Sequence, residues 1–120
     1  MFFWGKEKKA ANFGERVAAK YLKQKGYKII TKNYRLKFGE IDIVAEKDGV
    51  IAIVEVKQRA IGTVYLPREA VNISKQKKIK RTAEHYRIKN KLTDRFFRFD
   101  VVEVIGDKKP EINHIENAFK

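Results

Sequence analysis

The strongest local constraint in this chain is the tetrapeptide Lys47-Asp48-Gly49-Val50, which joins two apolar segments. An Asp-Gly pair between two strand-like segments is a strong signal for a two-residue β-hairpin turn. We therefore predict antiparallel strands at residues 40–46 and 50–59. The register that follows from this turn places Asp42 directly opposite Glu55.

Directly opposed side chains on one face of a sheet have Cβ atoms only about 4.5–5.5 Å apart. Apart from Glu55, residues 51–56 are apolar on both faces, which is typical of a central strand, so Asp42 and Glu55 are expected to be partly removed from water. Two such carboxylates repel each other, and a divalent cation would relieve this because Mg²⁺ prefers carboxylate oxygens, waters and substrate phosphates. The alternative is a salt-bridged strand pair, in which Glu55 pairs with Lys57 on its own face and Asp42 pairs with an arginine.

The rest of the chain contains no repeat, linker or low-complexity segment, so residues 1–120 are interpreted as one domain. Residues 1–6 are interpreted as an N-terminal arm that packs on the domain or on a partner subunit, or makes a loose membrane or nucleic-acid contact. The order α-β-β-β-α-β predicts an α/β domain in which helices flank a mixed central sheet. The predicted elements are a helix at 8–25, strands at 27–36, 40–46, 50–59 and 95–105, a helix from Asn72 or Ser74 to about residue 90, and a short fifth strand at 111–115.

The charge balance of the chain is strongly basic, with 28 lysines and arginines against 15 aspartates and glutamates and a net charge of +13. Such a charge favours a polyanionic partner: DNA, RNA or an anionic membrane surface. No apolar run approaches the roughly 20 residues that a membrane span needs. The absence of cysteine excludes a disulfide scaffold, thiolate catalysis and cysteine zinc sites, and it fits a reducing cytoplasm.

Eight of the residues from 72 to 91 are lysine or arginine and one is glutamate. We interpret this helix as a surface that follows phosphates, and the alternative is a solvated helix face. Lys37 is a further residue expected near the approach to the site. The candidate nucleic-acid contacts are Lys75, Lys77, Lys78, Lys80, Arg81, Arg59 and Arg68.

Three other titratable residues, His85, His114 and Asp100, are candidates for the site. His85 and His114 have no partner at a spacing typical of a metal site or a catalytic base, so both are predicted to be structural. Asp100 either joins the acidic pair of Asp42 and Glu55 or forms an ion pair with a nearby arginine, Arg98 or Arg95. No phosphate-binding glycine loop or nucleophile elbow is present, so nucleotide-cofactor and acyl-transfer chemistry have no support.

Two levels of resemblance to known proteins follow from these residues. Asp42, followed thirteen positions later by Glu55-Val56-Lys57, resembles the core motif of the PD-(D/E)XK nucleases, although Ile41 stands where the motif name has proline. Nearly the whole chain resembles the YraN family of small bacterial nuclease-like proteins. The segments that carry this resemblance are 14–22, 39–45, 54–59, 69–71, Lys75-Gln76 and 98–102.

The resemblance implies an αβββαβ restriction-endonuclease-like core, similar to that of archaeal Holliday-junction resolvases. It implies a Mg²⁺ or Mn²⁺ site in which Asp42 and Glu55 bind the metal, the main-chain carbonyl of Val56 assists and Glu15 completes the acidic cluster. Lys57 would orient the attacking water or stabilise charge on the phosphate.

For function, the resemblance implies a metal-dependent endonuclease acting on DNA, with branched or other structured DNA as one substrate class. Gln76 would reach the site or contact substrate, and Glu40 would either partner Lys57 or Arg59 or act as a further metal ligand. By analogy with resolvases, a homodimer is expected. The alternative is a non-catalytic nucleic-acid-binding module that retains the nuclease fold.

Overall fold

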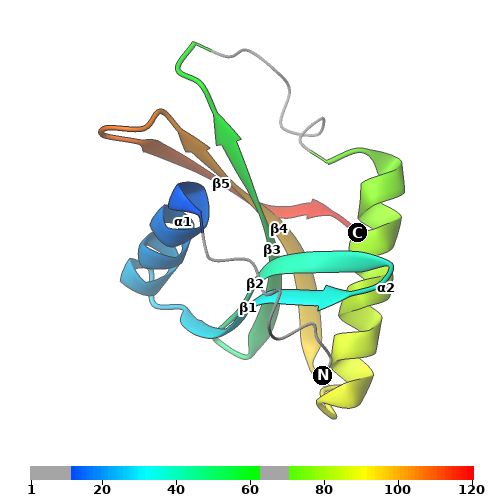
Figure 1. Ribbon diagram of the computed structural model, residues 1–120. Helices are drawn as coiled ribbons and strands as arrows, with labels where there is room; N and C mark the ends of the chain where they lie inside the picture. The colour runs from blue at the N-terminus through cyan, green and yellow to red at the C-terminus, as the bar shows by residue number, and fades with distance from the viewer. Residues whose placement is uncertain (1–11, 63–70) are drawn as a thin grey trace.

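The five strands form one layer with a helix on each side (Figure 1). The computed structural model describes residues 12–62 and 71–120. The sheet order is β1-β2-β3-β4-β5, and only the β3–β4 pair is parallel. This confirms the predicted α/β class with a mixed central sheet. The elements are α1 (Phe13–Gln24), β1 (Lys28–Leu36), β2 (Gly39–Lys47), β3 (Val50–Arg59), α2 (Ile73–Lys89), β4 (Phe96–Ile105) and β5 (Glu111–Phe119).

The β2–β3 hairpin has the register that its turn predicts. Asp48 and Gly49 have φ of 52° and 80°, the left-handed conformation that a type I′ turn requires at both central positions. The ladder ends at the Ile43–Val54 pair, and Asp42 and Glu55 are the next residues on the two strands. The paired residues are Lys47 with Val50, Glu46 with Ile51, Ala45 with Ala52, Val44 with Ile53 and Ile43 with Val54.

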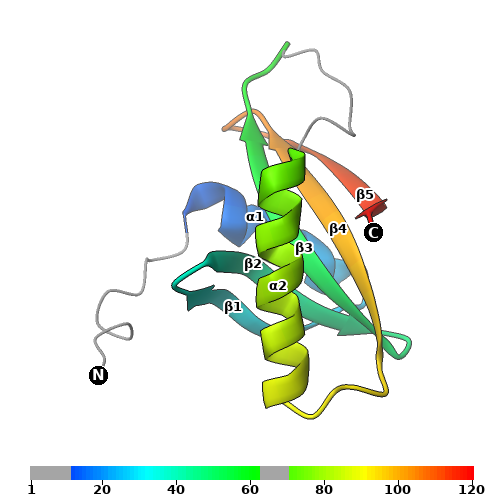
Figure 2. The same cartoon turned by 90° about the vertical axis from the view of Figure 1, so that its right-hand side faces the viewer.

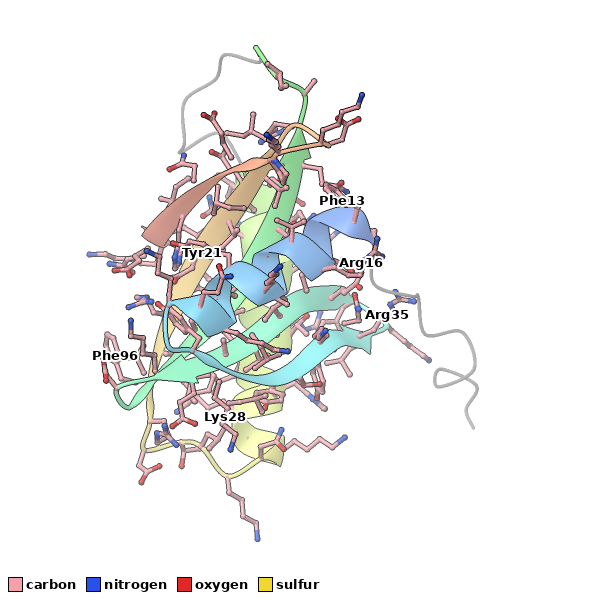
Figure 3. All side chains as sticks on the ribbon, turned by 90° about the vertical axis from the view of Figure 1, so that its left-hand side faces the viewer. Phe13, Arg16, Tyr21, Lys28, Arg35 and Phe96 are labelled. Carbon is pink, nitrogen blue, oxygen red and sulfur yellow. The ribbon has the colours of Figure 1, made fainter. Side chains whose placement is uncertain are left out.

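Helix α1 lies across one face of the sheet, the face seen in Figure 3. The Asn12 side chain accepts the N–H of Glu15 at 2.8 Å, and the Glu15 carboxylate accepts the N–H of Asn12 at 3.3 Å. This capping box satisfies two backbone donors, so the helix begins at Phe13, later than the predicted residue 8. Residues 8–11 lie outside the described part of the chain. The buried side chains of this layer include Ala18, Leu22, Ile43, Ala45, Ala52, Val54 and Val102.

Helix α2 covers the opposite face and connects the parallel strands β3 and β4 (Figure 2). Asn72 caps it by accepting the N–H of Lys75 at 2.9 Å. Neither of the two described helices is long and apolar enough to cross a membrane. The buried side chains between α2 and the sheet include Ile79, Ala83, Tyr86, Ile51, Ile53 and Val101.

Gly39 allows the β1–β2 turn to touch α2. A Cβ atom at this position would lie 2.4 Å from Oγ1 of Thr82 and 2.9 Å from the main-chain oxygen of Lys78. The Thr82 hydroxyl is itself held in place because it donates to that same oxygen at 2.8 Å. Any side chain at residue 39 would therefore push the turn away from the helix.

Strand β5 continues to Phe119, whereas the sequence pattern predicted an end at Ile115. The β4–β5 register shifts between Phe99 and Val101, and Asn117 has a φ of 54°. Such an irregularity interrupts the alternation of inward and outward side chains, which is why the pattern ended early. The predicted arm at residues 1–6 lies outside the described part of the chain.

Asp100 on β4 is completely buried and forms an ion pair with Arg98. Arg98 donates to its two carboxylate oxygens at 2.8 and 2.9 Å, the Nε2 atom of His114 lies 2.8 Å from Oδ2, and the N–H of Asn117 donates to Oδ1 at 3.0 Å. Burial alone raises the pKa of Asp100, but the bonds from His114, Arg98 and Asn117 outweigh it and hold that pKa below its usual value. Asp100 and His114 therefore belong to a buried polar network.

Candidate functional site

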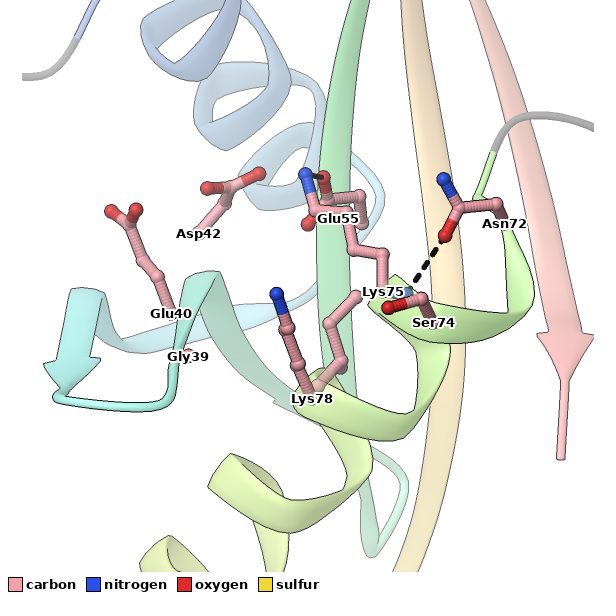
Figure 4. Close-up of a pocket in the computed structure, with 9 residues that line it drawn as sticks. Gly39, Glu40, Asp42, Glu55, Asn72, Ser74, Lys75 and Lys78 are labelled. Carbon is pink, nitrogen blue, oxygen red and sulfur yellow. Dashed lines mark hydrogen bonds and ion pairs between the residues drawn. The ribbon is translucent and has the colours of Figure 1, made fainter.

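Asp42 and Glu55 converge near the middle of the sheet (Figure 4). The Oδ2 atom of Asp42 accepts the N–H of Val56 at 2.8 Å, which holds this β2 side chain against β3. The Glu55 side chain is only 5% exposed. The two acids are thus neighbours in a largely desolvated setting, as the register predicted.

The environment makes ionisation of Asp42 unfavourable and raises its pKa from 3.8 to about 7. Burial is the largest cause, and the negative charge of Glu55 is the next. The hydrogen bond from Val56 opposes this increase, while Glu15 and Glu40 add to it. At neutral pH the acid pair therefore attracts any cation that can reach it.

Asp42→Asn is expected to increase the free energy of unfolding by roughly 1–3 kcal/mol at about pH 8 without divalent metal. The pKa of Asp42 is about 7 in the folded protein, above the usual 3.8, so the folded state retains a proton that the unfolded chain loses in between. Wild-type stability therefore falls as pH rises through this window, and the loss is complete above about pH 7. Urea denaturation at about pH 4 and pH 8 measures it, and an equal difference at both pH values would contradict it.

Two lysines surround Glu55. The Nζ atom of Lys75 lies 2.6 Å from Oε2 of Glu55, and the Nζ atom of Lys57 lies 3.7 Å from the same oxygen. Burial and the charge of Lys75 lower the pKa of Lys57. Burial also opposes protonation of Lys75, but its bond and attraction to Glu55, aided by Asp42, raise its pKa. The site therefore combines two acids with two cationic donors.

Lys75 lies at the site, in a position that the sequence pattern did not predict. We predicted it as a nucleic-acid contact on the helix surface, but it reaches from the first turn of α2 to Glu55 (Figure 4). The available signal was topological, because a helix that connects parallel strands begins near the carboxyl end of the strand before it. Lys75 and the two acids border a cavity of about 300 Å³, whose other lining residues are Gly39, Glu40, Asn72, Ser74, Lys78 and Ile79.

Glu15 and Glu40 have local partners. Glu15 is buried at 3% exposure and is engaged in the α1 capping box, from which its charge also reaches Asp42. Glu40 forms an ion pair with Arg35 at 3.3 Å. The prediction of Lys57 or Arg59 as the partner of Glu40 is wrong, because the β1–β2 register places Arg35 directly opposite Glu40.

The donor set fits a hard divalent cation. Asp42 and Glu55 offer carboxylate oxygens whose mutual repulsion a cation would relieve, and Mg²⁺ commonly uses only one or two carboxylates with waters and substrate phosphates. In the described residues, no three acids or histidines are arranged to hold a metal ion by themselves. Any metal would therefore need oxygen ligands from outside these side chains, such as water or phosphate.

Only some of the other predicted nucleic-acid contacts lie near the acid pair. Lys77, Lys78 and Arg81 line a second hollow beside the first cavity. Arg68 lies outside the described residues. The remaining contacts lie elsewhere: Gln76 Nε2 donates to the Val71 carbonyl at 2.9 Å, Lys80 Nζ lies 5.9 Å from the Phe119 ring centroid, and Arg59 Nε lies 4.0 Å from the Glu103 carboxylate.

Comparison with known proteins places this arrangement in a family. The model of the "Uncharacterised protein family UPF0102" matches residues 14–104, which include both acids and all of α2. The chain belongs to the UPF0102 family. UPF0102 is the YraN family, so the resemblance seen in the motifs is confirmed. UPF0102 proteins of Clostridioides difficile and Alkaliphilus metalliredigens are 51% and 48% identical to it over 112 residues, which cover 93% of this chain and 97% and 98% of the relatives.

A more divergent UPF0102 protein, from Persephonella marina, is 40% identical over 119 residues, which cover 99% of this chain and 97% of that protein. These relatives match nearly their whole length, so the similarity extends over the fold and the site together. The UPF0102 family is described as uncharacterised.

Proposed function

We propose that this UPF0102 protein is a metal-dependent endonuclease that hydrolyses phosphodiester bonds in DNA, including branched or other structured DNA. The proposal is carried by half-buried Asp42 and buried Glu55, which line a cavity together with Lys75 from the basic helix, while Lys57 lies beside Glu55. Two acids repel a phosphate, so a surface that only binds nucleic acid does not need them. They become useful when a cation lies between them and the phosphate.

In this proposal, Asp42 and Glu55 hold Mg²⁺ or Mn²⁺, together with the main-chain carbonyl of Val56. When bound, such a cation would lower the pKa of a bound water and neutralise charge on the scissile phosphate. Lys57 lies 3.7 Å from Glu55 and would orient the attacking water or stabilise the negative charge that develops on the phosphate. The hydrogen bond from Val56 keeps the Asp42 carboxylate in position, so little reorganisation is needed when substrate binds.

A second candidate function is non-catalytic binding of nucleic acid. One observation favours it: the Lys75 ammonium group lies 2.6 Å from Glu55 and already neutralises part of the acid pair without a metal. In this alternative, Lys75 and Glu55 form a structural ion pair, and the basic face of α2 supplies salt-dependent binding.

Cleavage assays on the purified protein distinguish the two functions. Linear duplex, single-stranded, flap and four-way-junction DNA are incubated with Mg²⁺, with Mn²⁺ and with EDTA. We expect products in the presence of Mg²⁺ or Mn²⁺ and none with EDTA. Salt-sensitive binding to the same DNA, with no product in either metal, would favour the non-catalytic module.

A further inference from the structure

A second hollow lies beside the acid site, between the β1–β2 turn and α2. It has a volume of about 310 Å³ and is lined by Lys37, Phe38, Lys77, Lys78 and Arg81. Within residues 12–62 and 71–120, none of its cationic side chains forms an ion pair with a carboxylate. The hollow is therefore a concave surface of uncompensated positive charge, which attracts an anion.

The hollow is adjacent to the acid site, because Lys78 lines both cavities. Lys75, Lys78 and Arg81 follow one another at intervals of three residues, so they lie along one side of α2. Gly39 lets the β1–β2 turn touch the helix at Lys78, and this contact brings the two cavities together. A phosphate chain that passes Lys75 at the acid pair can therefore continue past Lys78 toward the second hollow.

The second hollow also contains a cation–π contact. The guanidinium carbon of Arg81 lies 4.1 Å from the centroid of the Phe38 ring. Phe38 is half-buried and Arg81 is exposed, so the guanidinium group that contacts the ring remains accessible to a ligand. A planar guanidinium can stack on an aromatic base as well as contact phosphate. The hollow thus offers both a phosphate contact and a stacking platform.

We propose that this hollow binds the nucleotide that flanks the cleaved phosphate, an inference that rests on the proposed nuclease function. Lys77 and Lys78 contact its phosphate, and its base stacks on the Arg81–Phe38 pair. A base within a duplex is covered by its neighbours on both sides, so only an unpaired base can stack here. The substrate is therefore DNA with an unpaired nucleotide beside the cut, such as a single strand, a flap or an open branch.

Binding measurements in EDTA test this without any need for cleavage. The probes are a fluorescently labelled single-stranded oligonucleotide and the perfect duplex of the same sequence. Arg81→Lys keeps the charge but removes the plane, and Phe38→Leu removes the aromatic support. Each is expected to weaken single-strand binding by roughly 5- to 10-fold and duplex binding by less than about 2-fold. Arg87→Lys, the same substitution further along α2, is the matched control and should change neither.

Two results would overturn the stacking platform: unchanged single-strand binding in both variants, or equal losses for single strand and duplex. The second result would mean that the hollow provides only charge. The binding test and the cleavage assay have independent outcomes, so the hollow and the nuclease function can be rejected one without the other. Selective loss of single-strand binding in a protein that never cleaves DNA would support the hollow and reject the nuclease, whereas cleavage with unchanged binding in both variants would do the reverse.

Discussion

Glu55→Gln is expected to reduce metal-dependent DNA cleavage by roughly 10²–10³-fold, the loss typical when one preorganised electrostatic group is removed from an active site. Glutamine keeps the shape of the side chain but cannot supply the negative charge that a cation requires. Glu55 also interacts with Lys57 and Lys75, so the substitution changes the position of both cationic donors. Initial cleavage rates at saturating Mg²⁺ or Mn²⁺ measure the effect.

Glu84→Gln is the matched control for this experiment. Glu84 is exposed and pairs only with Arg87 among the described residues, on a part of α2 remote from the acid pair. Its replacement removes the same charge and should leave the cleavage rate within about 2-fold of wild type. If Glu55→Gln retained wild-type cleavage while remaining folded, Glu55 would not be part of the active site.

The largest expected loss of stability follows Asp100→Asn, roughly 3–5 kcal/mol, because one partner of a buried charge pair is removed. Asp100 has no exposed surface and receives hydrogen bonds from Arg98 and from the main chain of Asn117, with His114 as its third partner. An amide there would place donor hydrogens against the donors of Arg98. Since such domains are stable by only about 5–15 kcal/mol, the variant should unfold at a much lower urea concentration.

Acidification provides an internal check on this prediction. The pKa of Asp100 is lower in the folded protein than its usual value, so its stabilisation is complete above the unfolded value of about 3.9 and is lost as pH falls through the folded value. The difference between wild type and variant should therefore shrink below about pH 4. Asp107→Asn, on the exposed turn before β5, is the control. A loss as small as that of this control would mean that Asp100 is not stabilising.

The hairpin and the acid pair were predictable because both are local. The Asp48-Gly49 turn determines the β2–β3 register, and that register makes Asp42 and Glu55 the next residues after the last ladder pair. The element order and the cap at Asn72 are likewise matters of neighbouring residues, whereas the cap at Asn12 was not predicted and the first helix was predicted to begin at residue 8. The alternation of inward and outward side chains did not predict the end of β5, because the register shift there is decided by packing against β4.

The place of Lys75 could not be read from neighbouring residues. Its side chain looks like any other lysine on a basic helix, and only the connection from β3 through α2 brings it to Glu55. The ion pair of Glu40 with Arg35 depends in the same way on the register of the first hairpin. The burial of Asp100 depends on where β5 places His114.

By itself, the sequence determined the basic character of the protein, the α/β order and the opposed acids, since composition, periodicity and turn chemistry act within a few residues. The tertiary structure alone decided that Lys75 joins Lys57 beside the acids and that the two cavities lie next to each other. These arrangements depend on contacts between residues far apart in the chain, such as Gly39 with Thr82 and Phe38 with Arg81. The candidate site thus consists of a locally encoded acid pair and a basic surrounding that only packing assembles.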